Sequence, residues 1–211
     1  MRRRGTSRQG PAIVLKHRAQ PLGRLEQLVL RGDGLTTTAL EILTGRTITV
    51  RVHSHWRLPL HDEIMYPADE FYTGLDAPDL SWLAALGIDH LDAAVGDELL
   101  IRDVLLTGDD GVDYAAAAVV AVLDRLPASV ARDLASTDEP IGRMLAAARV
   151  PVSRELRDWG MRRLGVRGAS LGVDADGMTP ARTYLMRLVD DGRPLCLITE
   201  WFAPRVFEES S

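Results

Sequence analysis

Cysteine is nearly absent from this chain, which has Cys196 alone among 211 residues. A single thiol excludes an intramolecular disulfide and is typical of proteins in a reducing compartment, so we expect a cytoplasmic protein. Long apolar runs are missing too: none approaches the ~20 residues that cross a bilayer, and no membrane partner is expected. The net charge of -5 gives no reason to expect a nucleic-acid partner.

Motifs for metals, cofactors and activated nucleophiles are also missing. Residues 168–172 match the G-x-S-x-G pattern, but the histidine of such a triad follows the serine, and no histidine lies beyond His90. No glycine cluster stands between a strand and a helix in the order that binds phosphates or dinucleotides. His53 and His55 share one face of an expected strand, but no third metal ligand has a suitable spacing. We therefore expect neither a metal nor an organic cofactor.

The composition, 46% hydrophobic, suits one sizeable domain. Seven lysines and arginines, and no acidic residue, precede Glu26. We expect residues 1–22 to form a flexible basic tail and residues 23–207 to form a single domain. A weak anion-binding or partner-binding arm is the alternative for the tail.

Periodicity and turn residues predict an antiparallel α+β domain, because strands joined by hairpins are interrupted by a helical block. Hairpin turns are expected at residues 108–111 and 190–193. Strands are expected at residues 47–54, 98–107, 112–123, 182–189 and 195–202. Helices are expected at residues 25–30, 35–45 (with Thr36 to Thr38 able to cap it), 81–86, 126–135, 141–148 and 152–164. Residues 57–79 are expected to form a long loop, and residues 165–179 a glycine-rich connector.

Two charged residues stand in apolar strands. Glu200 alternates onto the same face as Cys196 and Ile198, and Arg102 shares its face with Leu100. A bare carboxylate in such a place costs roughly several kcal/mol. Arg102 and Glu200 therefore form either a structural ion pair within one sheet or a site, in which the arginine recognises an anion and the carboxylate handles a proton.

Four segments, in this order along the chain, resemble the chorismate lyases (chorismate pyruvate-lyases). They are L-L-I-R-D-V-L-L-T-G-D-D-G at 99–111, D-R-L-P-A-S-V at 124–130, D-E-P-I-G-R-M-L at 138–145 and D-G-R-P-L-C-L-I-T-E-W-F-A-P at 191–204. The resemblance covers roughly residues 25–207. The stretch His53-Ser54-His55-Trp56 departs from the family's pattern.

The resemblance implies an antiparallel β-sheet with helices packed on one face and helical flaps over an internal ligand pocket. It implies the conversion of chorismate to 4-hydroxybenzoate and pyruvate without a metal or organic cofactor. Carried over by position, Arg102 grips the ring carboxylate, and Glu200 lies near the ring hydroxyl and the ether oxygen. Leu35 and Ile141 match positions at which backbone groups meet the ligand.

The chemistry of the reaction leaves further choices open. Glu200 is a candidate proton donor to the leaving oxygen. The cation that meets the enolpyruvyl carboxylate is Arg143, Arg182 or Arg187. Two other functions also stay open: an enzyme of the same fold recruited to another reaction, such as a cyclase or Diels–Alderase of polyketide assembly, and a non-enzymatic small-molecule-binding domain. In all three the expected partner is a small organic molecule.

Overall fold

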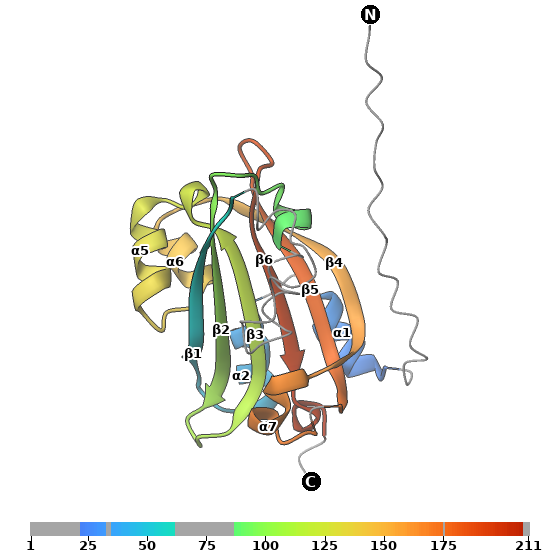
Figure 1. Ribbon diagram of the computed structural model, residues 1–211. Coiled ribbons are helices and arrows are strands. Elements are labelled where there is room, and N and C mark those ends of the chain that lie inside the picture. The colour runs from blue at the N-terminus through green and yellow to red at the C-terminus, as the bar shows by residue number, and fades with distance from the viewer. Residues whose placement is uncertain (1–21, 33–34, 62–86, 175, 209–211) are drawn as a thin grey trace, which may run out of the picture.

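The protein is built on one antiparallel six-stranded sheet with the strand order β1-β2-β3-β6-β5-β4. The computed structural model describes residues 22–32, 35–61, 87–174 and 176–208. The strands, shown in Figure 1, are β1 (Ile48–Pro59), β2 (Glu98–Gly108), β3 (Asp113–Val122), β4 (Val152–Arg163), β5 (Met178–Leu188) and β6 (Pro194–Phe202). The predicted antiparallel α+β class is confirmed.

Both predicted hairpins are present. Gly111 closes the β2–β3 turn with φ of 78°, and Gly192 closes the β5–β6 turn with φ of 70°, values that favour glycine. The alanine-rich run that precedes Val119 is the centre of β3, as predicted, because it pairs with β2 on one side and with β6 on the other. Small side chains there let layers pack closely on both faces of the sheet.

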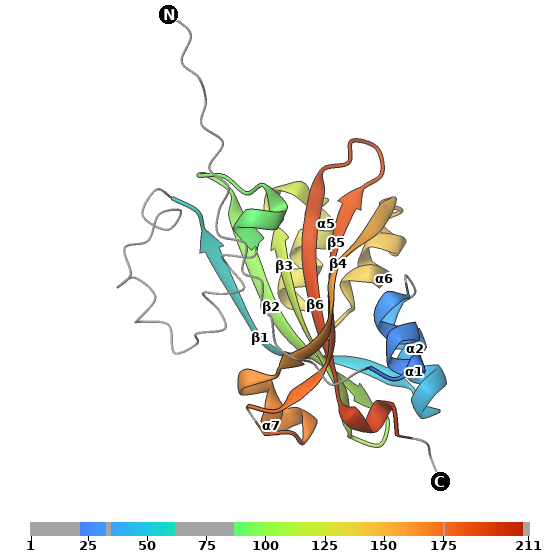
Figure 2. The ribbon, with the colours of Figure 1, turned by 90° about the vertical axis from the view of Figure 1, so that its right-hand side faces the viewer.

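Four helices cover one face of the sheet, as Figures 1 and 2 show: α1 (Arg24–Arg31), α2 (Thr36–Thr44), α5 (Ala128–Ser136) and α6 (Ile141–Ala147). The apolar side chains of α5 and α6 pack on Leu100, Val119 and Ile198, which point to this face. The other face is covered by the helical residues 87–91 and by α7 (Gly168–Leu171). The described residues also form short 3-10 helices, which are η2 (Leu123–Arg125), η3 (Gly165–Arg167) and η4 (Pro204–Val206).

The predicted helix at 152–164 is wrong: this segment is the edge strand β4. Leu156 and Trp159 lie three residues apart, a spacing that fits a helix, but a register shift between Leu156 and Asp158 interrupts the two-residue alternation of the strand. Both apolar side chains are more than a third exposed, so neither marks an inner face. An edge strand with mostly solvated side chains carries little periodic signal.

Other boundaries also differ from the prediction. β1 continues to Pro59, so the expected loop begins later. Residues 62–79 of that loop and the expected helix at 81–86 lie outside the described residues, as does nearly all of the expected tail at 1–22. The connector at 165–179 contains η3, α7 and the start of β5. Thr36 does not cap α2, because Leu35 is the N-cap residue and no side chain caps the helix.

Neighbouring charges on β2 point to opposite faces. Arg102 faces the helices and is 2% exposed. Asp103 faces the other way and forms an ion pair of 2.7 Å with Arg167 of η3, whose guanidinium lies 4.4 Å from the ring centroid of Trp201. The Asp103–Arg167 pair therefore ties η3 to the sheet.

We expect Asp103→Asn to lower the free energy of unfolding by roughly 3 kcal/mol, the low end of the range for a buried ion pair that loses one partner. Asparagine still accepts a hydrogen bond, but the buried guanidinium of Arg167 loses its ion pair with Asp103. Urea unfolding followed by circular dichroism measures the change. The control is Asp109→Asn in the exposed β2–β3 turn, which should change stability by less than about 0.5 kcal/mol. Equal effects of the two substitutions would contradict the assignment.

Candidate functional site

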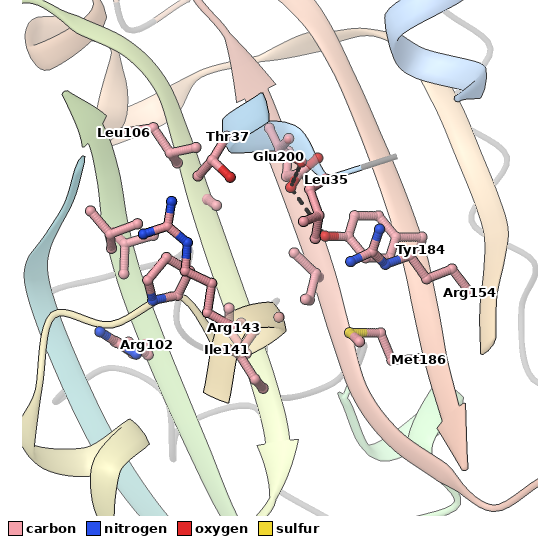
Figure 3. Close-up of a pocket in the computed structure, with 18 residues that line it drawn as sticks. Leu35, Thr37, Arg102, Leu106, Ile141, Arg143, Arg154, Tyr184, Met186 and Glu200 are labelled. Carbon is pink, nitrogen blue, oxygen red and sulfur yellow. Dashed lines mark hydrogen bonds between the residues drawn. The ribbon is translucent and has the colours of Figure 1, made fainter. Parts of the chain in front are cut away.

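A cavity lies between the helix-covered face of the sheet and the first turns of α2 and α6, as Figure 3 shows. Its volume, counted as space open to the centres of water molecules, is about 80 Å³. One water needs ~10–15 Å³ by the same measure, so the cavity has room for several waters or a small organic molecule. Its floor is mainly apolar and is formed by side chains of β1, β2, β3, β5 and β6, among them Val50, Leu106, Val119, Met186 and Ile198.

Glu200 stands at one end of this cavity, 4% exposed, and accepts three side-chain hydrogen bonds. The Thr36 hydroxyl donates to Oε1 at 2.5 Å, and the Tyr184 hydroxyl donates to the same oxygen at 3.1 Å. Arg182 Nε donates to Oε2 at 2.6 Å. Because each neighbour donates, the arrangement suits an ionised carboxylate, which can only accept.

The sheet itself brings these partners together. Arg182 on β5 is the direct cross-strand neighbour of Glu200 on β6, and Tyr184 lies two residues further along the same face. Burial alone would lower the pKa of Arg182, but the adjacent carboxylate outweighs it and the pKa lies above its ordinary value. Burial and the charge of Glu200 hold the pKa of Tyr184 well above the usual range, so its hydroxyl keeps its proton and donates.

Arg102 stands at the other end of the cavity, and the described residues give it no anionic partner. Its Nη1 donates to the Glu139 carbonyl at 3.1 Å and its Nη2 to the Thr137 carbonyl at 2.5 Å. In the part of the chain that the structure describes, no carboxylate forms an ion pair with it, and its buried Nε has no hydrogen-bond acceptor. Burial lowers the pKa of Arg102, and the more distant Asp138 charge offsets this only in part. A buried cation without a counter-ion is costly unless a ligand supplies the anion.

Arg102 and Glu200 line the same cavity but do not pair. The structural alternative, an Arg102–Glu200 ion pair, is therefore wrong. The reason is the strand order: β3 lies between β2 and β6, with Val119 opposite Arg102 and Ala117 opposite Glu200. The two charges instead stand apart, with an apolar floor between them.

Two further arginines line the cavity, and the sequence pointed to one of them. Arg143, on α6, lies at the place where the cavity meets a larger groove beside α5 and α6. Arg154, on β4, lies 5.7 Å from the ring centroid of Tyr184. Arg154 was missed because its strand was predicted to be helical. Arg187 does not line the cavity, and its guanidinium pairs with Glu155 at 3.1 Å.

The two positions expected to contribute backbone groups also line the cavity. Leu35 is the N-cap residue of α2, and Ile141 is the first residue of α6. The first N–H groups of a helix have no intrahelical acceptor, so they are available to a ligand. A Cβ atom added to Gly142 would lie 3.3 Å from Leu35 and 3.6 Å from Arg154, so the two helix starts and β4 meet closely here.

Titratable groups of the described residues outside this network give no second candidate for the chemistry. Among the described residues, no three His, Cys, Asp or Glu side chains are grouped so as to hold a metal ion. His53 and His55 are exposed, and the register shift between Val52 and Ser54 falls beside them. Burial raises the pKa of Cys196 to about 12, so its thiol is inert at neutral pH.

No helix within the described ranges is long and apolar enough to span a membrane.

The fold is that of known effector domains. Over 83% of this chain and 66% of the other, the structure is similar to PhnF from Mycobacterium smegmatis, with a TM-score of 0.56 and 14% identity. The effector domain of that protein matches over 82% of this chain and 91% of the domain, with a TM-score of 0.55. A GntR-family transcriptional regulator from Bacillus cereus gives a TM-score of 0.53 at 10% identity. At such identities the likeness shows the fold alone.

In sequence, the chain is similar to proteins named chorismate pyruvate-lyase, and the resemblance is thereby confirmed. It is 32% identical over 114 residues to the Mycobacterium leprae protein, a match that covers 53% of each chain, about half the length of that relative. It is 25% identical over 198 residues to the Mycobacterium tuberculosis H37Rv protein, covering 90% of this chain and 84% of the other. No protein-family model matches the chain.

We expect Arg102→Met to raise the free energy of unfolding by roughly 1 kcal/mol, because it removes a buried charge for which the described part of the chain supplies no counter-ion. The carbonyls of Thr137 and Glu139, which belong to exposed residues, can form hydrogen bonds with water instead.

Arg102→Met should also abolish the binding of benzoate, a minimal aromatic carboxylate, as measured by calorimetry. Arg187→Met, which removes a surface ion pair on β5, is the matched control and should leave benzoate binding unchanged. A loss of stability above about 1 kcal/mol in Arg102→Met would show that this arginine is a structural residue.

Proposed function

We propose that the chain is a chorismate pyruvate-lyase, which eliminates pyruvate from chorismate and leaves 4-hydroxybenzoate. The observation that carries the proposal is the arrangement, in one apolar cavity, of a carboxylate held by three donors and a buried arginine that has no anion among the described residues. A ligand that fits this arrangement has a carboxylate at one end, a flat apolar ring in the middle and a hydroxyl at the other end. The similarity to curated chorismate pyruvate-lyases supports the same substrate.

Arg102 is proposed to bind the ring carboxylate. Its guanidinium has five N–H donors, and the two hydrogen bonds to backbone carbonyls leave three for a ligand. The carbonyls of Thr137 and Glu139 also fix the plane of the guanidinium, so the fork is oriented before the ligand arrives. Backbone N–H groups of Leu35 and Ile141, at the starts of α2 and α6, are proposed to add to this recognition.

Glu200 is proposed to act as the proton acceptor. In the elimination, the C–H bond at the ring carbon that bears the hydroxyl breaks, and its electron pair completes the aromatic ring. The C–O bond at the adjacent ring carbon breaks, and its electron pair leaves with enolpyruvate, which takes up a proton on carbon to become pyruvate. The hydrogen bonding of Glu200 favours an ionised base over the proton-donating role expected from the sequence.

The second carboxylate of chorismate, on the enolpyruvyl group, requires a second cation. Of the three arginines considered from the sequence, Arg143 lines the cavity, Arg182 is engaged behind Glu200, and Arg187 lies outside. We propose that Arg143 meets this carboxylate, together with Arg154 on the facing strand. We further propose that the reaction needs no metal or organic cofactor and takes place in the cytoplasm.

Two other functions fit the same fold. A cyclase or Diels–Alderase depends more on shape than on charge, and retention of both Arg102 and Glu200 in one cavity disfavours it. A ligand-sensing module is suggested by the effector domain of PhnF, whose fold this chain shares. Such a module would bind the aromatic acid without turning over its precursor.

The test is to incubate the pure protein with chorismate in buffer containing EDTA and to measure 4-hydroxybenzoate and pyruvate. Both products should form in equal amounts, and Glu200→Gln should lower kcat by about 10²–10⁴-fold. The same variant should bind 4-hydroxybenzoate within about tenfold of the wild type, because Arg102 still holds the carboxylate. Arg187→Gln, at the exposed ion pair with Glu155, is the control and should keep wild-type kinetics.

Absence of turnover, with 4-hydroxybenzoate still bound, would replace the lyase by the ligand-sensing module. Full activity of Glu200→Gln would remove Glu200 from the chemistry.

A further inference from the structure

Arg182 has a second set of contacts that its pairing with Glu200 does not require. Its Nη1 donates to the Val29 carbonyl at 2.9 Å and to the Gly32 carbonyl at 2.7 Å. These carbonyls belong to the C-terminal end of α1, where carbonyl groups lack intrahelical donors and carry the negative end of the helix dipole. One buried guanidinium therefore joins the end of α1 to the carboxylate at the cavity.

Thr36 makes the same connection from α2. Its hydroxyl accepts a hydrogen bond of 2.9 Å from Arg182 Nη2 and donates one of 2.5 Å to Glu200 Oε1. Thr36 is the first residue of α2, whereas its partner Glu200 lies on β6, 164 positions away along the chain. Thr36 is 8% exposed, so water does not compete well for these hydrogen bonds.

We propose that Thr36 and Arg182 are positioning residues that fix the orientation of Glu200 and, through the same carboxylate, clamp α1 and the first turn of α2 onto the sheet over the cavity. The catalytic part of this inference rests on the proposed lyase function; the clamp does not. Two oxygens of one carboxylate, held by donors from a helix and a neighbouring strand, cannot rotate without breaking at least one hydrogen bond.

The kinetic experiment uses Thr36→Val, which has nearly the same shape and lacks the hydroxyl. We expect kcat to fall by about tenfold, with KM changed less than about threefold, because the substitution misorients Glu200 without touching the ring carboxylate contact. Thr36→Ser, which keeps the hydroxyl, should restore kcat. Thr38→Val on the exposed side of α2 is the matched control and should behave as the wild type.

A double-mutant cycle separates positioning from a general structural role. In the Glu200→Gln background, Thr36→Val should lower kcat by less than about twofold further, since its effect passes through the carboxylate. An equal loss in both backgrounds would overturn the positioning role.

The clamp is tested by hydrogen exchange, which needs no turnover. Amides of α1 and α2 should exchange about tenfold faster in Thr36→Val and in Glu200→Gln than in the wild type, while those of α5 stay unchanged. Arg182→Lys keeps the charge but loses the fork that reaches Val29 and Gly32, and it should accelerate exchange in α1 most. Unchanged exchange in all three variants would overturn the clamp. If the wild type proves inactive toward chorismate, the lyase proposal fails alone, and the exchange experiment still decides the clamp.

Discussion

The structure depends on how the buried carboxylate of Glu200 is stabilised. A charge with 4% exposure in a largely apolar interior is tolerated only when its hydrogen-bond capacity is used. Here the donors come from two elements: α2 supplies Thr36, and β5 supplies Arg182 and Tyr184. The contacts that stabilise the charge therefore also join the first turn of α2 to the sheet beside the cavity.

The two buried arginines of this face stand in opposite situations. Arg182 has a carboxylate partner and three further hydrogen bonds, so it is satisfied by the protein alone. Arg102 is as deeply buried but, within the described residues, has two carbonyl acceptors and no anion. This difference separates a cation satisfied by the protein from one that we propose to bind the carboxylate of a ligand. In that proposal the desolvation cost of Arg102 is met before the ligand binds.

On the face of the sheet opposite the cavity, an arginine and a carboxylate have a structural role. Asp103 and Arg167 form an ion pair, and Trp201 covers the guanidinium. The space that remains beside them is small, about 30 Å³. The sheet thus presents buried charged residues on both faces, and the cavity beneath α2 and α6 lies on the face that carries Arg102 and Glu200.

By itself, the sequence determined the sheet class, both hairpins, and two of the charged positions that line the cavity, Arg102 and Glu200. These features follow from local rules: glycine turns, two-residue alternation, and the cost of a charge within an apolar strand. It did not reveal β4, because a solvated edge strand with a bulge lacks periodicity. Tertiary structure alone brought Thr36 of α2 to Glu200 and put β3 between β2 and β6, which keeps Arg102 apart from Glu200. Contacts between segments distant in sequence leave no local trace.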